Sequence, residues 1–275
     1  MTTAPAPDLL PLKMYACCTA SHRTLADQWF LRTLQDNYNL ILEKIDAPNG
    51  SSRYKDASWM SAVEAKADLI LRALKENDGS VFIFSDVDIR FLGKTEPEVL
   101  ARMKDHDLAV LQDSPYGTLG TGFFACRSNP GTRALWADVL AFMRAHPGEH
   151  DQEALNHLWC RKSSLQRRLA WKLVSFTAHL PVPGLRALLK PLILRSRARL
   201  GNCYGIRLDF FPDTFWSPGI QSDKIWTPEQ PLNIPRGAVL HHANWASGTA
   251  DKIAQFEHAL QTQNKNSLHT GSPAV

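Results

Sequence analysis

Acidic residues are absent from one long stretch of this chain. Positions 154–208 contain no Asp or Glu, yet they hold 11 of the 31 Lys and Arg residues. The rest of the sequence therefore has 20 basic residues against its 27 acidic ones, so the net charge of +4 arises from a single segment. No nucleic-acid-binding motif accompanies this positive charge, and we expect no nucleic-acid partner.

Cysteines are also few, and their number and spacing argue against a domain held together by disulfides or by zinc. The five cysteines form an odd set without a C-x-x-C pair, which disfavours a disulfide framework or a zinc site. Their usage fits a reducing compartment, and we expect a cytoplasmic protein. Residues 1–11 lack the charged and apolar parts of a signal peptide, and no run of about 18 apolar residues predicts a membrane span.

Strand-like and helix-like segments alternate through the first 158 residues. Helical spacing occurs in 24–34, 58–76, 96–104, 131–145 and a segment that Asp151 is expected to cap, and the segments between them are strand-like, at 13–18, 38–45, 81–84, 108–111 and 122–127. This alternation predicts an α/β fold of the Rossmann type, with a mainly parallel sheet and helices on both faces.

The later part of the chain interrupts this alternation. Residues 161–200 are basic and apolar with three prolines, and they predict a helical insertion of two or three short helices. The pattern resumes with a last strand at 238–241 and a last helix at 249–260. We therefore expect a single domain over residues 1–275, with disorder in 1–11 and 263–275.

Two carboxylates follow the most apolar strand, which has the sequence Val81-Phe82-Ile83-Phe84-Ser85-Asp86-Val87-Asp88. Its unbroken apolar run predicts a strand buried on both faces. Because residues i and i+2 of an extended chain point to the same side, Asp86 and Asp88 should converge just past the strand's carboxyl end, where open α/β sheets bind ligands. Two such carboxylates repel each other unless a cation lies between them, and Mg²⁺ or Mn²⁺ is the natural choice.

Four motifs in order resemble those of the nucleotide-diphospho-sugar transferases, which are retaining glycosyltransferases of the GT-A fold. The first is this D-x-D stretch, and the second is Thr121-Gly122-Phe123-Phe124-Ala125-Cys126-Arg127. The third is Asp151-Gln152-Glu153-Ala154-Leu155-Asn156, and the last is His242-Ala243-Asn244-Trp245-Ala246-Ser247-Gly248 followed by Lys252. The resemblance implies a GT-A-type fold and a nucleotide-sugar donor.

The resemblance also implies a metal and diphosphate site. Asp88 would bind the metal directly, Asp86 would bind the metal or the ribose, and His242 would be the third ligand. A neutral imidazole suits Mn²⁺ better than Mg²⁺. Lys252 would meet the diphosphate, and Lys66 would make a second contact to a phosphate or the sugar. The glycines of the motifs, Gly122 and Gly248, are expected at the donor site.

Asp151 and Gln152 are expected beside the anomeric carbon of the sugar. In the enzymes that the sequence resembles, this aspartate contacts the sugar or stabilises an oxocarbenium-like state. No side chain is identified as a covalent nucleophile, so retention by double displacement and retention by same-face attack both stay open.

Together these features predict a metal-dependent glycosyltransferase that takes a UDP-sugar to a glycan or lipid-linked acceptor. A sugar-1-phosphate nucleotidyltransferase is the first alternative, but it should carry a Gly-rich loop where this chain has Cys18-Thr19-Ala20-Ser21-His22-Arg23. The second alternative is a non-catalytic scaffold at a membrane surface. We expect residues 161–200 to dock on an anionic membrane, as basic amphipathic helices do, which would place the protein on the inner face of the membrane.

Overall fold

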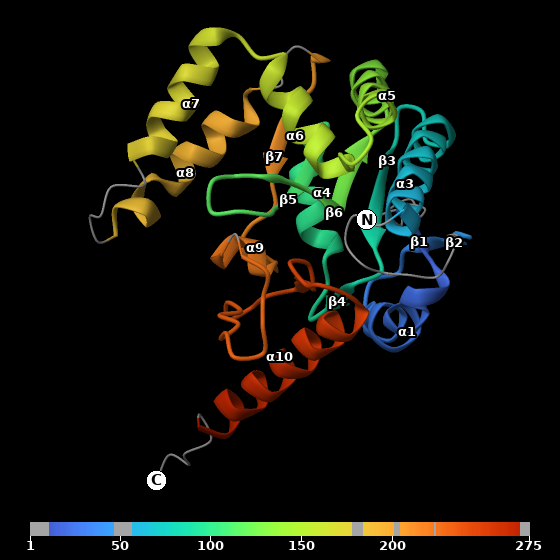
Figure 1. Cartoon of the computed structure of the whole chain (residues 1–275), viewed down its shortest axis with the longest axis vertical. Helices are drawn as coiled ribbons and strands as arrows, with labels where there is room; N and C mark the ends of the chain where they lie inside the picture. The colour runs from blue at the N-terminus through green and yellow to red at the C-terminus, as the bar shows by residue number, and fades with distance from the viewer. Residues whose placement is uncertain (1–10, 47–56, 178–183, 201–203, 223, 270–275) are drawn as a thin grey trace, which may run out of the picture.

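A mainly parallel sheet forms the centre of the molecule (Figure 1). The computed structural model describes residues 11–46, 57–177, 184–200, 204–222 and 224–269. Within them, six strands pair in the order β2-β1-β3-β6-β5-β7, and only β6 runs opposite to its two neighbours. The strands are β1 (Lys13–Cys18), β2 (Asn39–Lys44), β3 (Val81–Asp86), β5 (Leu108–Gln112), β6 (Leu119–Arg127) and β7 (Leu208–Phe210). The predicted α/β fold with a mainly parallel sheet is confirmed.

A second, small sheet joins distant parts of the sequence. It has the order β4-β9-β8, with bounds β4 (Ile89–Phe91), β8 (Phe215–Trp216) and β9 (Leu240–His242). β4 follows β3 directly and pairs antiparallel with β9, so that Ile89 lies opposite His242. This pairing brings the C-terminal motif beside the D-x-D motif.

Helices cover both faces of the central sheet. The chain contains a helical stretch at 20–33, which divides into η1 (Ala20–His22), α1 (Arg23–Leu25), the π-helical η2 (Ala26–Phe30) and α2 (Leu31–Thr33). The other helices are α3 (Ala57–Glu76), α4 (Glu96–Met103), α5 (Pro130–Ala145), α6 (Asp151–Arg161), α7 (Leu165–Thr177), α8 (Leu185–Ala198), α9 (Pro218–Gln221) and α10 (Thr249–His269).

The alternation of side chains along the strands builds two apolar layers. Phe84 and Phe124 point to the face covered by α3, α5 and α6, and Phe124 stacks between Phe84 and Trp136 with ring centroids 5.4 and 5.0 Å apart. Ile83 points to the opposite face, where the 20–33 stretch, α4 and the small sheet pack. Because β3 is covered on both sides, it is apolar throughout until Ser85 and Asp86, which emerge at its carboxyl end.

The predicted insertion contains two helices within the described residues, α7 and α8, which pack against each other and stand out from the sheet as an arm (Figure 1). Residues 178–183 and 201–203 of this region lie outside the described part. The last helix is longer than the predicted 249–260 and continues to His269, into the region for which we expected disorder. Residues 1–10 and 270–275 lie outside the described residues. No described helix has the length and apolar character that crossing a membrane requires.

Candidate active site

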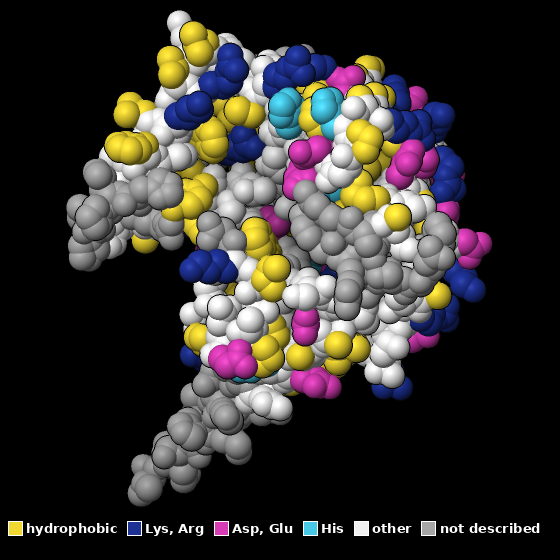
Figure 2. Space-filling model, viewed as in Figure 1, with side chains coloured by type: hydrophobic (Ala, Val, Ile, Leu, Met, Phe, Trp, Pro, Cys, Tyr) yellow, Lys and Arg dark blue, Asp and Glu magenta, His cyan; other side chains and the backbone are white. Residues whose placement is uncertain are grey.

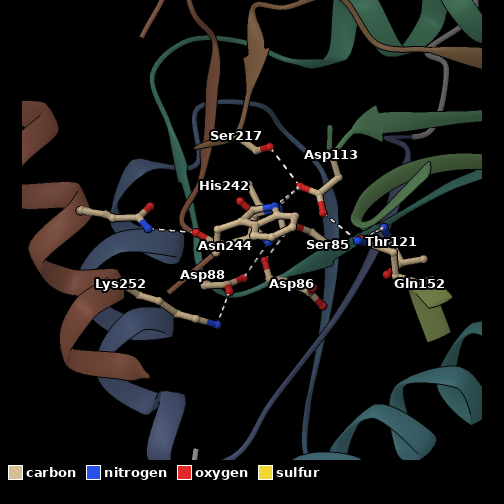
Figure 3. A network of polar contacts seen from close by, with 12 residues as sticks. Ser85, Asp86, Asp88, Asp113, Thr121, Gln152, Ser217, His242, Asn244 and Lys252 are labelled. Carbon is tan, nitrogen blue, oxygen red and sulfur yellow. Dashed lines mark hydrogen bonds and ion pairs between the residues drawn. The ribbon is translucent and has the colours of Figure 1, made fainter. Parts of the chain in front are cut away.

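Asp86, Asp88 and His242 meet at the edge of the sheet where β3 ends (Figure 3). One ligand atom from each lies within 4.8 Å of the others. The two carboxylates come from the end of β3 and the turn after it, and His242 comes from β9, which the small sheet holds beside β4. All three predicted metal ligands are therefore brought together by strand pairing rather than by flexible loops.

Two lysines offset the charge of the paired carboxylates. Lys252 Nζ lies 2.5 Å from Asp88 Oδ2, and Lys66 Nζ lies 3.0 Å from Asp86 Oδ1. Burial acts to raise the pKa of both carboxyl groups. It prevails at Asp86, whose pKa is raised despite Lys66, whereas Lys252 and His242 hold the pKa of Asp88 well below its usual value. The two neighbouring carboxyl groups therefore have pKa values shifted in opposite directions by their different surroundings.

The three residues fit a divalent cation with oxygen and nitrogen ligands. Asp88 Oδ1 is buried without a hydrogen-bond partner, and it faces His242 Nε2 at 3.3 Å. A buried carboxylate oxygen without a donor is costly unless a cation meets it. Burial acts to lower the pKa of His242, but Asp88 outweighs burial and raises it. Asp88 Oδ1 therefore favours positive charge beside it, which a proton on His242 or a cation bound by the neutral ring can supply.

Gly122 provides the space that the His242 ring occupies. A Cβ placed on Gly122 would lie 2.2 Å from Cε1 of His242, which is far inside van der Waals contact. The glycine of the second motif is thus required by the ring of the fourth motif. Gly248 differs, because its carbonyl oxygen accepts a hydrogen bond from the backbone N–H of Lys252 at the start of α10, and it does not line the cavity of the site. The contact of Gly248 with a nucleotide-sugar donor stays a prediction.

Helix α6 presents Asp151 and Gln152 to the same edge. Lys66 Nζ lies 3.0 Å from Asp151 Oδ2, so one lysine joins the carboxylates of Asp86 and Asp151. Burial acts to raise the pKa of Asp151, but Lys66 outweighs burial and holds it far below its usual value. The expectation that Asp151 caps the helix was wrong: His150 is the N-cap, its side chain accepting from Gln152 N, and Asp151 is the first helical residue. Its carboxylate is therefore available to Lys66 rather than used in the cap.

Asp113 is a buried carboxylate of the site that the sequence reasoning missed. It accepts hydrogen bonds from Gln152 Nε2 at 2.7 Å and from Ser217 Oγ and Trp245 Nε1 at 3.2 Å, and also from the Asn244 side chain (Figure 3). Asp113 follows β5 directly, so the edge rule that selected Asp86 applies equally to it. It fastens α6, the start of α9 and the C-terminal motif to the sheet.

Trp245 has a left-handed backbone with φ 53°, which is uncommon for a bulky residue. Its indole N–H is fixed by Asp113, and its carbonyl oxygen accepts from the Trp226 backbone N–H at 2.7 Å. Such a conformation persists only where surrounding contacts determine it, and these contacts lie at the site.

A cavity of about 810 Å³ encloses these groups. All of the predicted site residues except Gly248 line it, together with further residues that the sequence reasoning did not select, among them Thr19, His22, Asp113, Asn156, Trp171, Arg197 and Asn244. His22 follows β1 at the same edge, and burial lowers its pKa to about 4. The neighbouring His241 points away from the cavity and is fully buried, with its ring centroid 4.9 Å from that of Trp216 and 5.1 Å from that of Phe256.

We predict that Gly122 and His242 are energetically coupled. Gly122→Ala should lower the free energy of unfolding by about 1–3 kcal/mol, because the new methyl group must displace the imidazole. In a His242→Ala background the same change should cost much less, because the ring is gone. Urea unfolding of the four proteins of this cycle measures the coupling. Additive effects of the two substitutions would contradict the assignment.

Comparison with known proteins identifies the family. The sequence profile of the nucleotide-diphospho-sugar transferases matches residues 25–256, whereas no curated protein sequence matches the chain. Solved structures resembling this one, each at 10% identity, include a glycosyltransferase involved in glycosylation of the major capsid of PBCV-1 (TM-score 0.45; 91% of this chain, 99% of that chain). They also include GlyE of Streptococcus pneumoniae TIGR4 (TM-score 0.40; 91% and 60%) and the bifunctional WbbM (TM-score 0.38; 56% and 38%). TM-scores of this size indicate distant likeness, and the assignment rests on the sequence match over most of the chain: the protein belongs to the nucleotide-diphospho-sugar transferase family.

Proposed function

We propose that the protein is a metal-dependent glycosyltransferase that moves a sugar from UDP to a glycan or lipid-linked acceptor with retention of configuration. The observation that carries the proposal is the cluster of Asp86, Asp88 and His242, whose ligand atoms lie within 4.8 Å of one another in a cavity of about 810 Å³. A donor's diphosphate needs this combination of a cation site and a nearby lysine. Family membership supports the transferase activity, and the cluster supports Mn²⁺ or Mg²⁺ as its cofactor.

Asp86, Asp88 and His242 would hold the ion, which when bound supplies Lewis-acid stabilisation of the leaving diphosphate. Lys252 is paired with Asp88 in this structure, at 2.5 Å. We expect its ammonium group to turn from the carboxylate to the diphosphate once the donor is present, because the phosphate oxygens then offer the larger negative charge. The lysine thereby stabilises charge that grows on the leaving UDP.

Asp151 would stabilise positive charge at the anomeric carbon. Lys66 forms ion pairs with both Asp151 and Asp86. It therefore fixes the distance between the carboxylate that would face the sugar, Asp151, and the one that would bind the metal, Asp86. Gln152 is fixed by Asp113 and would add a polar contact to the sugar.

Asp88→Asn should reduce metal-dependent affinity for UDP at least tenfold and abolish sugar transfer. The substitution removes the charged ligand on which Lys252 and His242 converge. Calorimetry with Mn²⁺ and UDP and a screen of UDP-sugars for UDP release measure both effects, with the surface variant Asp105→Asn as the matched control. Unchanged affinity in Asp88→Asn would contradict the metal assignment. Formation of UTP and a sugar 1-phosphate from a UDP-sugar and added pyrophosphate would instead favour the nucleotidyltransferase alternative.

We also propose that the arm formed by α7 and α8 docks on an anionic membrane. Four apolar side chains follow helical spacing along α7 and are strongly exposed: Leu165 at 62%, Leu169 at 56%, Leu173 at 68% and Phe176 at 69%. Figure 2 shows hydrophobic side chains along the arm with Lys and Arg among them. An exposed apolar stripe beside unopposed positive charge is typical of helices that lie in a lipid interface.

The positive charges of residues 161–207 divide into two groups in the structure. Lys162 pairs with Asp138, Lys190 with Asp213 and Arg207 with Asp107, and Arg197 is buried. Five basic residues of the arm and of the end of α6 are exposed and have no ion pair among the described residues: Arg161, Arg167, Lys172, Arg195 and Arg199. Since each Lys or Arg near an anionic surface contributes about 1 kcal/mol, these would give roughly 5 kcal/mol, which suffices for reversible binding beside a lipid-linked acceptor on the inner face of the membrane.

Leu169→Asp combined with Leu173→Asp should abolish binding to anionic vesicles while leaving the fold intact, because both side chains already face solvent. Co-sedimentation with phosphatidylcholine vesicles, with and without phosphatidylglycerol, measures the effect at low and high salt. Leu100→Asp, at a 44% exposed position on α4, is the matched control. A wild-type protein that ignores anionic vesicles at low salt, or a double variant that binds them equally well, would refute the docking surface.

A further inference from the structure

Arg197 brings a buried positive charge from the arm into the wall of the cavity. The residue lies near the end of α8 and is only 5% exposed, yet it lines the same cavity as Asp86 and Asp151. Its guanidinium Cζ lies 5.0 Å from the centroid of the Trp171 ring, and its Nε donates to the Gly117 carbonyl oxygen at 3.3 Å. Its Nη2 donates to Asn156 Oδ1 at 2.7 Å. This side chain therefore ties helix α8 to the wall of the cavity, beside the apolar contacts that Leu194 and Ala198 make with the main core.

Every one of these hydrogen-bond acceptors is neutral. Among the residues that the structure describes, no carboxylate lies within ion-pair distance of Arg197, whereas the other two cavity cations, Lys66 and Lys252, each pair with aspartate. Burial lowers the pKa of Arg197, and the Cys160 thiol beside it offsets this only in part. A buried guanidinium costs free energy unless an anion meets it. The planar fork of an arginine matches a carboxylate or phosphate in shape as well as in charge.

Helix α6 places this charge relative to the reaction centre. Gln152 stands in the first turn of α6, and Asn156 is four residues later on the same face of the helix, where its Nδ2 donates to the Gln152 carbonyl oxygen. Four residues of helix rise about 6 Å. Because Asn156 holds Arg197, the guanidinium enters the cavity from the arm, about one helical turn from Gln152.

We propose that Arg197 forms an anion subsite that binds a carboxylate or phosphate carried next to the sugar being transferred. The oxyanion belongs either to the donor, as the carboxylate of a uronic acid, or to the acceptor, as the phosphate that links a sugar to its carrier. Asn156 and Trp171 fix the plane of the guanidinium, so the subsite is formed before the ligand arrives. The role of the anion rests on the proposed function, whereas its binding to Arg197 does not.

Two titrations test the subsite and separate its two sources. With Mn²⁺ and UDP saturating the metal and diphosphate region, methyl phosphate is titrated by calorimetry as a stand-in for an acceptor phosphate. In the second titration, the affinities of UDP-glucuronate and UDP-glucose are compared in the presence of Mn²⁺. Saturable binding of methyl phosphate assigns the anion to the acceptor, and at least about tenfold tighter binding of UDP-glucuronate assigns it to the donor.

In either titration, Arg197→Gln should weaken the anion-dependent binding at least tenfold. Arg195→Gln, which changes an exposed arginine on the same helix, should leave this binding unchanged. Affinity for Mn²⁺ and UDP should stay unchanged in both variants. If Arg197→Gln does not fold, Arg197→Lys decides, because it keeps the charge, loses the planar fork and should still weaken anion binding severalfold. Absence of binding and of donor preference in the wild type, or equal behaviour of the Arg197 variants, would overturn the subsite. Failure of Mn²⁺ and UDP to bind the wild type would instead count against the proposed function.

Discussion

The repulsion between buried carboxylates at one edge of the sheet is the constraint on which the arrangement of the site depends. Asp86 ends β3, Asp88 lies in the turn that leads to β4, and their carboxylates meet at one point that Asp151 approaches from α6. Positive charge must come from elsewhere in the chain, and it comes from far away: Lys66 precedes Asp86 by 20 residues, and Lys252 follows Asp88 by 164. The small sheet, α3 and α10 are thus positioned where their cations are needed.

A second group of contacts is built on hydrogen bonds rather than on ion pairs. Asp113 gathers amide, hydroxyl and indole donors from three segments, and it thereby fixes Gln152 and the strained Trp245. The arm is attached in a related way, since Arg197 binds neutral acceptors on α6 and on the turn at Gly117. One face of the arm is apolar and exposed while Arg197 lines the cavity, so membrane docking and recognition of a substrate anion would be joined in two helices.

The sequence predicts the features that depend on local pattern. The buried strand, its paired aspartates and the long α3 follow from periodicity, and the resemblance to a family adds His242 and Lys252. Asp113 could have been found by applying the same edge rule to β5, but its donors come from segments about 40, 100 and 130 residues away, which no local pattern brings together. Arg197 could not be distinguished from the other basic residues of the insertion, because only packing against Trp171 and Asn156 separates a buried arginine from an exposed one. The cap of α6 was misassigned because histidine is a rare N-cap, and the local sequence favours aspartate.

The central claim is that Asp86, Asp88 and His242 hold a divalent cation that replaces Lys252 as the partner of Asp88. Anomalous diffraction at the manganese edge, from crystals grown with MnCl₂ and UDP, tests it most directly. We expect one anomalous peak bounded by these three side chains, at about 2.0–2.3 Å from their ligand atoms, with Lys252 turned from Asp88 towards the diphosphate. A nucleotide bound without an anomalous peak at this position, with Lys252 still paired to Asp88, would contradict the claim.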